Sequence, residues 1–374
     1  MKAAFITDAS DFSDANRALI ALLAELKKCN VEAFVLLPGS GVIASELKKL
    51  KINYTAVPHK RWVRFAYERE GAFPKLRSNL KLLKAAAGTL REEKINIVHT
   101  NSAYCPFGAM LSNALKLPHL WHIREEVNYR DDLRWDWGRW LTKAVISQAG
   151  AVIASSESAF KNAVGRSQDT LHKVLYNGVS SVDPAAWPEN KAFTFLVYGE
   201  IAPFRGQAQA IHAASIVRET YPDIRLVVAG SGRKKDVQEL KSLTAALGML
   251  DLVEFMEEDK LPADFIKQSH VALAPASYTA DGQIIMEAMA AGRPVIAMDT
   301  EANGEFIKHG ENGLLYSGSS INLAEEMLQT LKQPRRAREL GKAGFEFIKE
   351  HCDIKSYAAQ VLAVYQELLN GRKG

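Results

Sequence analysis

The sequence predicts an α/β protein made of two similar halves, each a parallel β-sheet covered by helices. Short, continuously apolar runs alternate with amphipathic helical patterns, which is typical of strands buried on both faces of a parallel sheet. The alternation pauses over 180–192, where two prolines and several small residues give no period and indicate a linker. The length of 374 residues agrees with a prior of two to three domains.

The first half contains six apolar runs and six helical patterns. The predicted strands span 2–7, 31–37, 52–57, 95–100, 119–123 and 151–155. The predicted helices lie near 14–28, 42–50, 74–93, 106–115, 132–148 and 157–164. We therefore expect a Rossmann-like first domain over 1–182.

The second half repeats this organisation. The predicted strands span 193–199, 224–230, 253–256, 271–276 and 294–298, and the predicted helices lie near 206–219, 234–247, 261–269 and 284–291. We expect a second Rossmann-like domain over 191–350 and a C-terminal helix at about 353–370 that packs back on the first domain. Ligands bind beyond the carboxyl ends of parallel strands, so two such sheets facing each other would make one deep cleft.

The composition excludes several classes of protein. Apolar residues make up 47% of the chain and charged residues 24%, which rules out a disordered chain, a fibrous protein and a disulfide-stapled miniprotein. A net charge of +4 does not indicate nucleic acid as a partner. No apolar run reaches the ~18 residues of a transmembrane helix, and the N-terminal run is too short for a signal peptide. Three widely spaced cysteines predict reduced thiols of a cytoplasmic protein and no metal site.

The segment 277–297 carries the strongest signal for a binding site. A loop with Asp281 and Gly282 precedes a helix that starts near Gln283, and the unpaired N–H groups of a helix N-terminus suit phosphate. Glu287 lies one turn on, on the face of Gln283, where a carboxylate can accept both hydroxyls of a ribose. The alternative is a plain strand–loop–helix unit with an exposed acid.

This segment resembles the signature of glycosyltransferase family four, the retaining nucleotide-sugar transferases of GT-B fold. That signature has two glutamates separated by seven residues, the second followed by an Ala-Met-Ala-x-Gly type of helix. Glu287 begins a close match to the second part, whereas Thr279 stands at the first glutamate and Asp281 at the usual aromatic. The resemblance implies two facing Rossmann-like domains with a cleft between them.

Further segments resemble the same family in the right order. They are 35–50, 119–126, 174–180, 194–211, 225–232 and 306–316. Arg205 takes the position of the family's diphosphate-binding lysine, while Glu200 reverses the charge of its diphosphate-binding arginine. His122 takes the position of a histidine that reaches the donor sugar. The loop 11–17 lacks the two glycines that the family usually has there.

The resemblance implies three groups of site residues. The catalytic group is His122, Arg205 and Glu287, and the donor-binding group is Gly178, Gly199, Gly206, Gly230, Asp281, Gly282, Gln283 and Ile284. The acceptor-side group is Ser13, Asp14, Arg124 and Glu125. Some alternatives stay open, because His122 can be a structural histidine and Arg124 can pair with Glu125. The basic cluster 233–235 either compensates for the reversed charge or starts a solvated helix.

The stretch 59–94 is basic and rich in aromatics. Ten Lys and Arg stand against four Glu, a net charge of +6, and the interleaved apolar residues are Trp62, Phe65, Tyr67, Phe73, Leu76, Leu80 and Leu83. Such a stretch suits an anionic membrane surface or a pyrophosphate-linked acceptor. The alternative is a solvated helix face with the leucines packed as a stripe. The tryptophans Trp135, Trp137 and Trp140 are predicted to pack.

We expect a retaining transferase that moves a hexose from a UDP- or GDP-linked sugar to a lipid-linked or saccharide hydroxyl, without a cofactor. Its expected role is cell-surface polysaccharide or lipopolysaccharide synthesis, in the cytoplasm or at the inner face of the membrane. One alternative is a degenerate GT-B protein that binds a sugar nucleotide or a partner without turnover, which Thr279 and Glu200 favour. Another is a sugar-nucleotide epimerase or a phosphorylase of similar fold.

Overall fold

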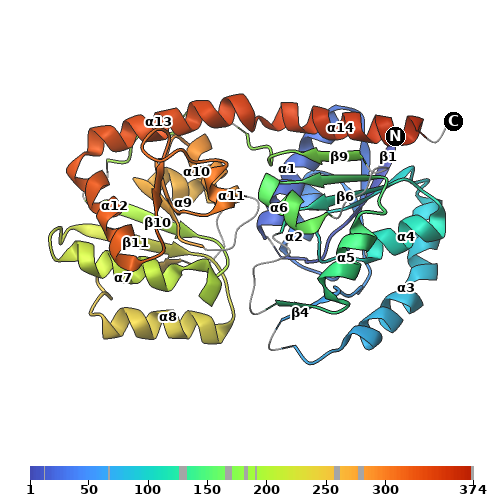
Figure 1. The fold of residues 1–374 in the computed structure, drawn as a ribbon, viewed down its shortest axis with the longest axis horizontal. Helices are drawn as coiled ribbons and strands as arrows, with labels where there is room; N and C mark the ends of the chain where they lie inside the picture. The colour runs from blue at the N-terminus through green and yellow to red at the C-terminus, as the bar shows by residue number, and fades with distance from the viewer. Residues whose placement is uncertain are drawn as a thin grey trace. The chain divides into compact units, whose positions relative to one another are not determined.

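A computed structural model gives the fold of the chain (Figure 1). It describes all residues except 12, 66–67, 126–132, 165–170, 181–183, 190–191, 257–261, 277–281 and 372–374. The chain falls into two compact units, here called unit 1 (Met1–Gly178 with Ile354–Gly374) and unit 2 (Val179–Asp353).

Unit 1 is built on a seven-stranded sheet with the order β3-β2-β1-β5-β6-β8-β9. Its strands are β1 (Lys2–Ile6), β2 (Glu32–Leu37), β3 (Asn53–Ala56), β5 (Ile97–Thr100), β6 (His119–Ile123), β8 (Ala151–Ala154) and β9 (Leu171–Val174). All neighbours are parallel, and Phe5 in β1 pairs with Val35 on one side and His99 on the other. The carboxyl ends of all seven strands therefore meet at one edge.

Helices cover both faces of this sheet. They are α1 (Asp14–Lys28), α2 (Val42–Lys49), α3 (Ala72–Glu92), α4 (Phe107–Leu115), α5 (Gly138–Ile146), α6 (Glu157–Ala163) and α14 (Ile354–Asn370). Alternate residues of β1 point to opposite faces, so Phe5 packs in a core with Leu19 and Val361 while Ile6 packs in another with Leu90. Each such buried aliphatic side chain stabilises the fold by about 1.5–3 kcal/mol.

A small antiparallel pair joins β4 (Val63–Phe65) and β7 (Leu133–Trp135). The prediction of a helix over 132–148 is wrong in its first part, because β7 occupies 133–135 and the helix α5 begins only at Gly138. The cause is tertiary, since Val63 pairs with Trp135 and the N–H of Asp136 donates to the carbonyl of Trp62 at 2.9 Å.

Unit 2 is built on a six-stranded parallel sheet with the order β12-β11-β10-β13-β14-β15. Its strands are β10 (Phe193–Tyr198), β11 (Ile224–Ala229), β12 (Val253–Met256), β13 (Val271–Ala274), β14 (Val295–Met298) and β15 (Leu314–Tyr316). Its helices are η1 (Pro203–Arg205), α7 (Gln207–Arg218), α8 (Lys234–Ala246), α9 (Pro262–Gln268), α10 (Gln283–Ala290), α11 (Glu301–Gly304), α12 (Ser320–Lys332) and α13 (Pro334–His351). The predicted α/β class with two parallel sheets is confirmed.

Within the residues that the structure describes, no helix combines the length and the apolarity needed to cross a bilayer. The same residues contain no group of three or more His, Cys, Asp or Glu side chains arranged to hold a metal ion.

Candidate active site

The loops after β10 and β11 run side by side at the carboxyl edge of unit 2. Gly199 and Gly230 follow these strands with φ of 122° and 153°, a region that favours glycine. A Cβ on Gly230 would lie only 1.9 Å from the carbonyl oxygen of Gly199, so the close approach requires glycine. The N–H of Ile201 donates to the carbonyl of Ser231 at 2.7 Å and continues the pairing past the strands.

Arg205 lies at the end of η1, directly before the first turn of α7. Gly206 forms the N-cap of α7 with φ 76°, and a Cβ there would meet the Pro275 carbonyl oxygen at 2.5 Å. The Arg205 guanidinium lies 3.8 Å from the Glu200 carboxylate, so these two residues at the altered positions form an ion pair. The side-chain amide of Gln207 donates to the Glu200 carbonyl at 2.7 Å and fixes the loop.

The basic cluster 233–235 begins α8 rather than standing apart as free cations. Arg233 makes a two-pronged contact to Asp236, at 2.6 and 2.8 Å, and Lys235 lies 3.6 Å from Glu239. Arg233 therefore has a carboxylate partner of its own within its helix turn.

The N-terminus of α10 carries the predicted phosphate and ribose groups. Gly282 is the N-cap with φ 55°, and a Cβ there would come within 2.5 Å of the Phe306 ring. The Gln283 side-chain amide donates to the Glu287 carboxylate at 2.7 Å, so these residues share one face of the helix. Ile284 is half-buried beside them. Asp281 and Thr279 lie outside the described residues.

His122 lies in β6 within a buried chain of hydrogen-bonding groups in unit 1. Its Nδ1 lies 3.2 Å from Nε2 of His99, and its Nε2 lies 3.3 Å from the Tyr357 hydroxyl. His99 in turn meets the Tyr365 hydroxyl through Nδ1 at 2.6 Å. Burial, followed by the positive charge of Arg124, holds the pKa of both histidines well below the usual range, so both are neutral at pH 7.

Arg124 follows β6 and is itself buried. Its guanidinium donates to Asn101 at 2.8 Å, to Asn177, and to the Tyr357 hydroxyl at 3.3 Å. These partners are neutral. Asn101 follows β5, Asn177 lies after β9 and Tyr357 belongs to α14, so the Arg124 side chain connects three parts of unit 1. The alternative in which the guanidinium pairs with Glu125 does not occur; Glu125 accepts instead from the Arg124 backbone N–H at 3.3 Å.

Glu125 forms the acidic part of this edge. Its carboxylate accepts the N–H of Ala103 at 2.7 Å. Burial, and then the negative charge of Asp8, raise the pKa of Glu125 to about 8. Asp8 follows β1 and binds Arg61, with the guanidinium Nε 3.0 Å from its carboxylate. This shift favours the protonated form of Glu125, which can donate as well as accept.

The remaining predicted residues of unit 1 have local roles. Ser13 is the N-cap of α1, and its backbone N–H donates to the Asp11 carboxylate at 3.2 Å. Asp14 pairs with Arg17 at 2.9 Å in the first turn of that helix. Gly178 packs under α14, since a Cβ there would lie 2.7 Å from Cα of Ile354.

Sequence reasoning missed His99, Asn177, Tyr357 and Tyr365 as parts of the site. The apolar stripe of α14 contains both tyrosines and predicts a packed helix face. It gives no signal that their hydroxyls meet histidines more than 200 residues earlier in the chain.

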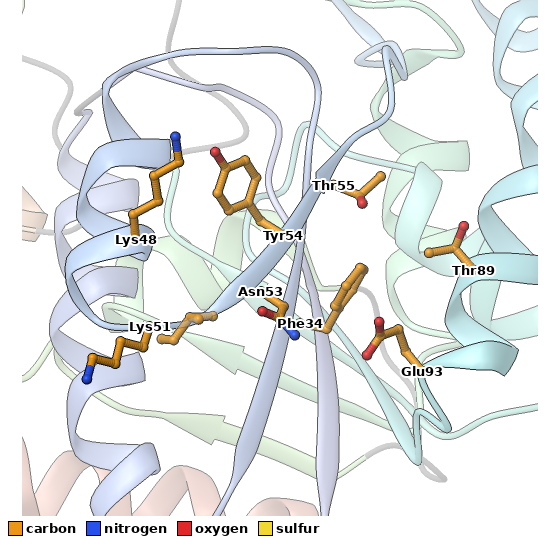
Figure 2. A pocket seen from close by; sticks show the side chains of 9 residues that line it. Phe34, Lys48, Lys51, Asn53, Tyr54, Thr55, Thr89 and Glu93 are labelled. Carbon is orange, nitrogen blue, oxygen red and sulfur yellow. The ribbon is translucent and has the colours of Figure 1, made fainter.

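A separate cavity of about 530 Å³ opens beside the edge strand β3 (Figure 2). Lys48 and Lys51 near the end of α2, together with Thr89 and Glu93 near the end of α3, frame it. The ends of these helices lie toward the amino ends of the strands, so this cavity is remote from the carboxyl-edge residues described above.

Two family models match adjoining parts of the chain. Glycosyltransferase Family 4 matches residues 15–181, and Glycosyl transferases group 1 matches residues 182–347. Together they cover almost all of both units.

Named relatives agree with these matches. An uncharacterized glycosyltransferase of Methanocaldococcus jannaschii is 25% identical over 76% of this chain and 79% of the relative. The putative glycosyltransferase EpsD of Bacillus subtilis is 33% identical over 40% of this chain and 39% of the relative. The chain thus covers less than half the length of EpsD in that match.

Solved structures share the fold. HepE of Anabaena in complex with UDP-glucose superposes with a TM-score of 0.82 at 20% identity, covering 98% of this chain and 100% of HepE. Sucrose-phosphate synthase from Thermosynechococcus elongatus gives a TM-score of 0.77 at 18% identity, covering 99% and 100%. The fold is that of the GT-B glycosyltransferases. The chain belongs to the glycosyltransferases of the family-four and group-1 type, and it is a transferase enzyme.

Proposed function

We propose that the protein is a retaining glycosyltransferase that moves a hexose from a UDP- or GDP-linked sugar to a hydroxyl acceptor. The observation that carries this proposal is the carboxyl edge of unit 2. Four glycines with positive φ, Gly199, Gly206, Gly230 and Gly282, form tight turns there, and two of them, Gly206 and Gly282, begin helices. Helix N-termini and exposed N–H groups favour a diphosphate. The UDP-glucose bound to HepE supports a nucleotide sugar as the donor.

In this proposal the diphosphate and the ribose of the donor bind to unit 2. Arg205 and the N–H groups after Gly282 bind the diphosphate, and Glu287 accepts the ribose hydroxyls. The bond between sugar C1 and the diphosphate oxygen breaks, while the acceptor oxygen bonds to C1 on the same face. The acceptor proton passes to a leaving diphosphate oxygen. The protein positions the reactants and stabilises the departing charge.

We assign the sugar and acceptor side to unit 1. His122 is neutral, and a neutral imidazole suits a sugar hydroxyl as a hydrogen-bond partner. Both ring nitrogens already contact protein groups, so a direct bond to the sugar requires exchange of the contact to His99 or to Tyr357. Glu125, Ser13 and Asp14 are the proposed acceptor-side groups. We propose a lipid-linked or saccharide acceptor, a role in cell-surface polysaccharide or lipopolysaccharide synthesis, and a place in the cytoplasm at the inner membrane face.

A second candidate is a protein that binds a sugar nucleotide without turnover. The ion pair between Glu200 and Arg205 favours it, because the Glu200 carboxylate competes with the leaving diphosphate for the Arg205 guanidinium. A carboxylate beside a diphosphate also repels it.

A panel of UDP-, GDP- and ADP-sugars tests both candidates. We expect one base alone to raise the unfolding temperature, and we expect free nucleotide diphosphate to form with the same donor. Stabilisation without release of nucleotide, with a range of hydroxyl acceptors present, would support the second candidate. No stabilisation by any donor would contradict both.

A further inference from the structure

Large apolar side chains are exposed on two helices of unit 1, α3 and α5. These side chains, here called the α3–α5 patch, are Phe73, Leu76, Leu80, Trp140 and Leu141. Trp140 is 82% exposed, Phe73 74% and Leu80 54%. The prediction that Trp140 packs is wrong, and the alternative of a packed leucine stripe does not hold for Leu76 and Leu80. Exposed apolar clusters of this kind mark binding surfaces.

One ring contact joins the start of α3 to the start of α5. The ring of Phe73 at the start of α3 meets the ring of Trp137 before α5 edge-on, with centroids 5.2 Å apart. The Lys75 ammonium donates to the Val63 carbonyl at 2.6 Å and lies 3.2 Å from the Asp136 carboxylate. The face of α3 with Lys75 is thereby anchored inward, and the face with Phe73 and Leu80 is turned outward.

Basic residues share this outward face. At 100° per residue, Arg77, Lys81 and Lys84 lie within the same half of the α3 helix as Phe73 and Leu80. Arg139 in α5 is exposed next to Trp140. Within the part of the chain that the structure describes, none of these four cations has an acidic side chain within 4.0 Å. The chain as a whole carries only +4, so this charge is concentrated on one surface.

We propose that the α3–α5 patch docks on an anionic lipid bilayer. The aromatic and leucine side chains enter the boundary between head groups and acyl chains, where tryptophan is favoured, and the four cations meet lipid phosphates. This inference rests on the proposed function in that it names the surface that brings the enzyme to a lipid-linked acceptor. This surface is not the same as the basic stretch 59–94. Trp62 of that stretch is buried and takes no part in the surface, whereas the exposed Trp140 lies outside the stretch.

Sedimentation with vesicles tests the surface directly. The full-length protein is mixed with vesicles of phosphatidylcholine alone or of phosphatidylcholine with phosphatidylglycerol. We expect binding to the anionic vesicles only, with release as salt rises, since the Debye length falls to about 10 Å at 0.1 M. Each cation near such a surface is worth about fivefold in partitioning. The triple variant Arg77→Glu, Lys81→Glu, Lys84→Glu should therefore bind at least roughly a hundredfold more weakly.

Matched variants in unit 2 supply the controls. Lys332, Lys342 and Lys349 are also exposed, and their triple change to Glu alters the net charge equally. Leu250 and Ile321 are isolated exposed apolar residues, 67% and 61% exposed, for comparison with Leu80→Asp. We expect loss of binding from the patch variants and no loss from the controls. Trp140 fluorescence should shift to the blue with anionic vesicles, and Trp140→Phe should remove most of that shift.

Three results would overturn the proposal: equal binding to neutral vesicles, no binding to anionic vesicles, or equal losses in the unit 2 controls. Donor hydrolysis without vesicles separates this proposal from the proposed function. If the patch variants keep wild-type hydrolysis and lose vesicle binding, both stand. If the wild type binds anionic vesicles through the patch and hydrolyses no donor, the surface stands and the proposed function fails.

Discussion

The carboxyl edge of the sheet in unit 1 is filled by side chains, whereas the corresponding edge in unit 2 is lined by backbone. In unit 1, His99, His122 and Arg124 are buried. The two histidine rings contact each other, His99 contacts the Tyr365 hydroxyl, and Arg124 donates to the Tyr357 hydroxyl. In unit 2, glycines at positive φ let the loops at the strand ends pack closely, and the charged residues Arg205 and Glu287 belong to the same loops and helix starts. The same parallel scaffold thus supports two kinds of surface.

The two edges are suited to different ligand groups. Exposed backbone N–H groups at helix N-termini attract anions whatever their detailed shape, so unit 2 suits a diphosphate. A closed hydrogen-bond network around the buried Arg124 guanidinium holds a fixed geometry, and any group left unpaired in it costs free energy. Unit 1 therefore suits precise placement of hydroxyls. The following predictions change one edge at a time.

The largest expected effect is a selective loss of unit 1 at acid pH. His99, His119 and His122 are buried with lowered pKa values, about 3 for His119 against an ordinary 6.5. Below pH 6.5 the unfolded chain binds protons that the folded unit excludes, so stability falls as pH falls toward the folded pKa. Each histidine contributes up to about 1.4 kcal/mol per pH unit. The raised pKa of Glu125 acts in the opposite direction above pH 4.5 and offsets one histidine, so the net loss is up to roughly 3 kcal/mol per pH unit.

Hydrogen exchange with mass spectrometry can measure this unit by unit. Between pH 7 and pH 5, the protection of β5 and β6 amides should fall further than that of β10 and β11, after correction for intrinsic exchange rates. Among the described residues of unit 2, one histidine has a lowered pKa, His270, at about 4. Parallel losses in the two units would contradict the prediction.

The next effect concerns catalysis in unit 2. Arg205→Ala should lower turnover by at least about a hundredfold, because one preorganised donor to a leaving group is worth ~2.7–4 kcal/mol in the transition state. Arg205→Lys keeps the charge and should recover part of the loss. Arg233→Ala is the matched control, since Arg233 is engaged by Asp236 and should matter little. Wild-type turnover in Arg205→Ala would mean that the diphosphate is held elsewhere.

Glu287→Ala tests the ribose contact. We expect affinity for the nucleotide diphosphate to fall about tenfold to a hundredfold, since a hydrogen bond to a charged group contributes roughly 1.5–3 kcal/mol. Calorimetry with the nucleotide and its 2′-deoxy form sharpens the test. If Glu287 holds the ribose, the deoxy nucleotide binds the wild type more weakly but binds the variant as the ribonucleotide does. An additional loss with the deoxy form in the variant would place the ribose on another residue.

The two edges also differ in how far the sequence predicts them. In unit 2 the site elements are local: a strand, a glycine turn and a helix follow each other within about ten residues, so Gly282 and α10 could be placed from 277–297 alone. In unit 1 the position of His122 in β6 was predictable from a short apolar run. Its partners were not, because Tyr357 and Tyr365 reach it through the return of α14 to unit 1.

Short strands were missed for a related reason. The strand β7, Leu133–Trp135, has three residues and no period of its own, and it exists because β4 pairs with it. The ion pair between Glu200 and Arg205 also depends on the geometry of the loop after β10, which brings the two side chains within 3.8 Å.

The smallest effect tests whether that ion pair restrains the edge of unit 2. The Glu200 carboxylate is 58% exposed and lies 3.8 Å from the Arg205 guanidinium, which is 19% exposed. An exposed carboxylate at this distance competes with a phosphate for the same cation and repels the phosphate, although solvent and salt weaken both effects. Glu200→Gln should tighten nucleotide diphosphate binding by up to about tenfold at low salt, and Glu200→Arg should tighten it further, because it restores a cation. The gain should shrink as ionic strength rises. For Glu200→Gln it should also be smaller in the Arg205→Ala background, where the repulsion is relieved but no cation is released. Calorimetry of the single and double variants at two salt concentrations measures these differences. Weaker binding of Glu200→Gln would mean that Glu200 orients Arg205 toward the donor, and the pair would then be part of the binding site rather than a restraint on it.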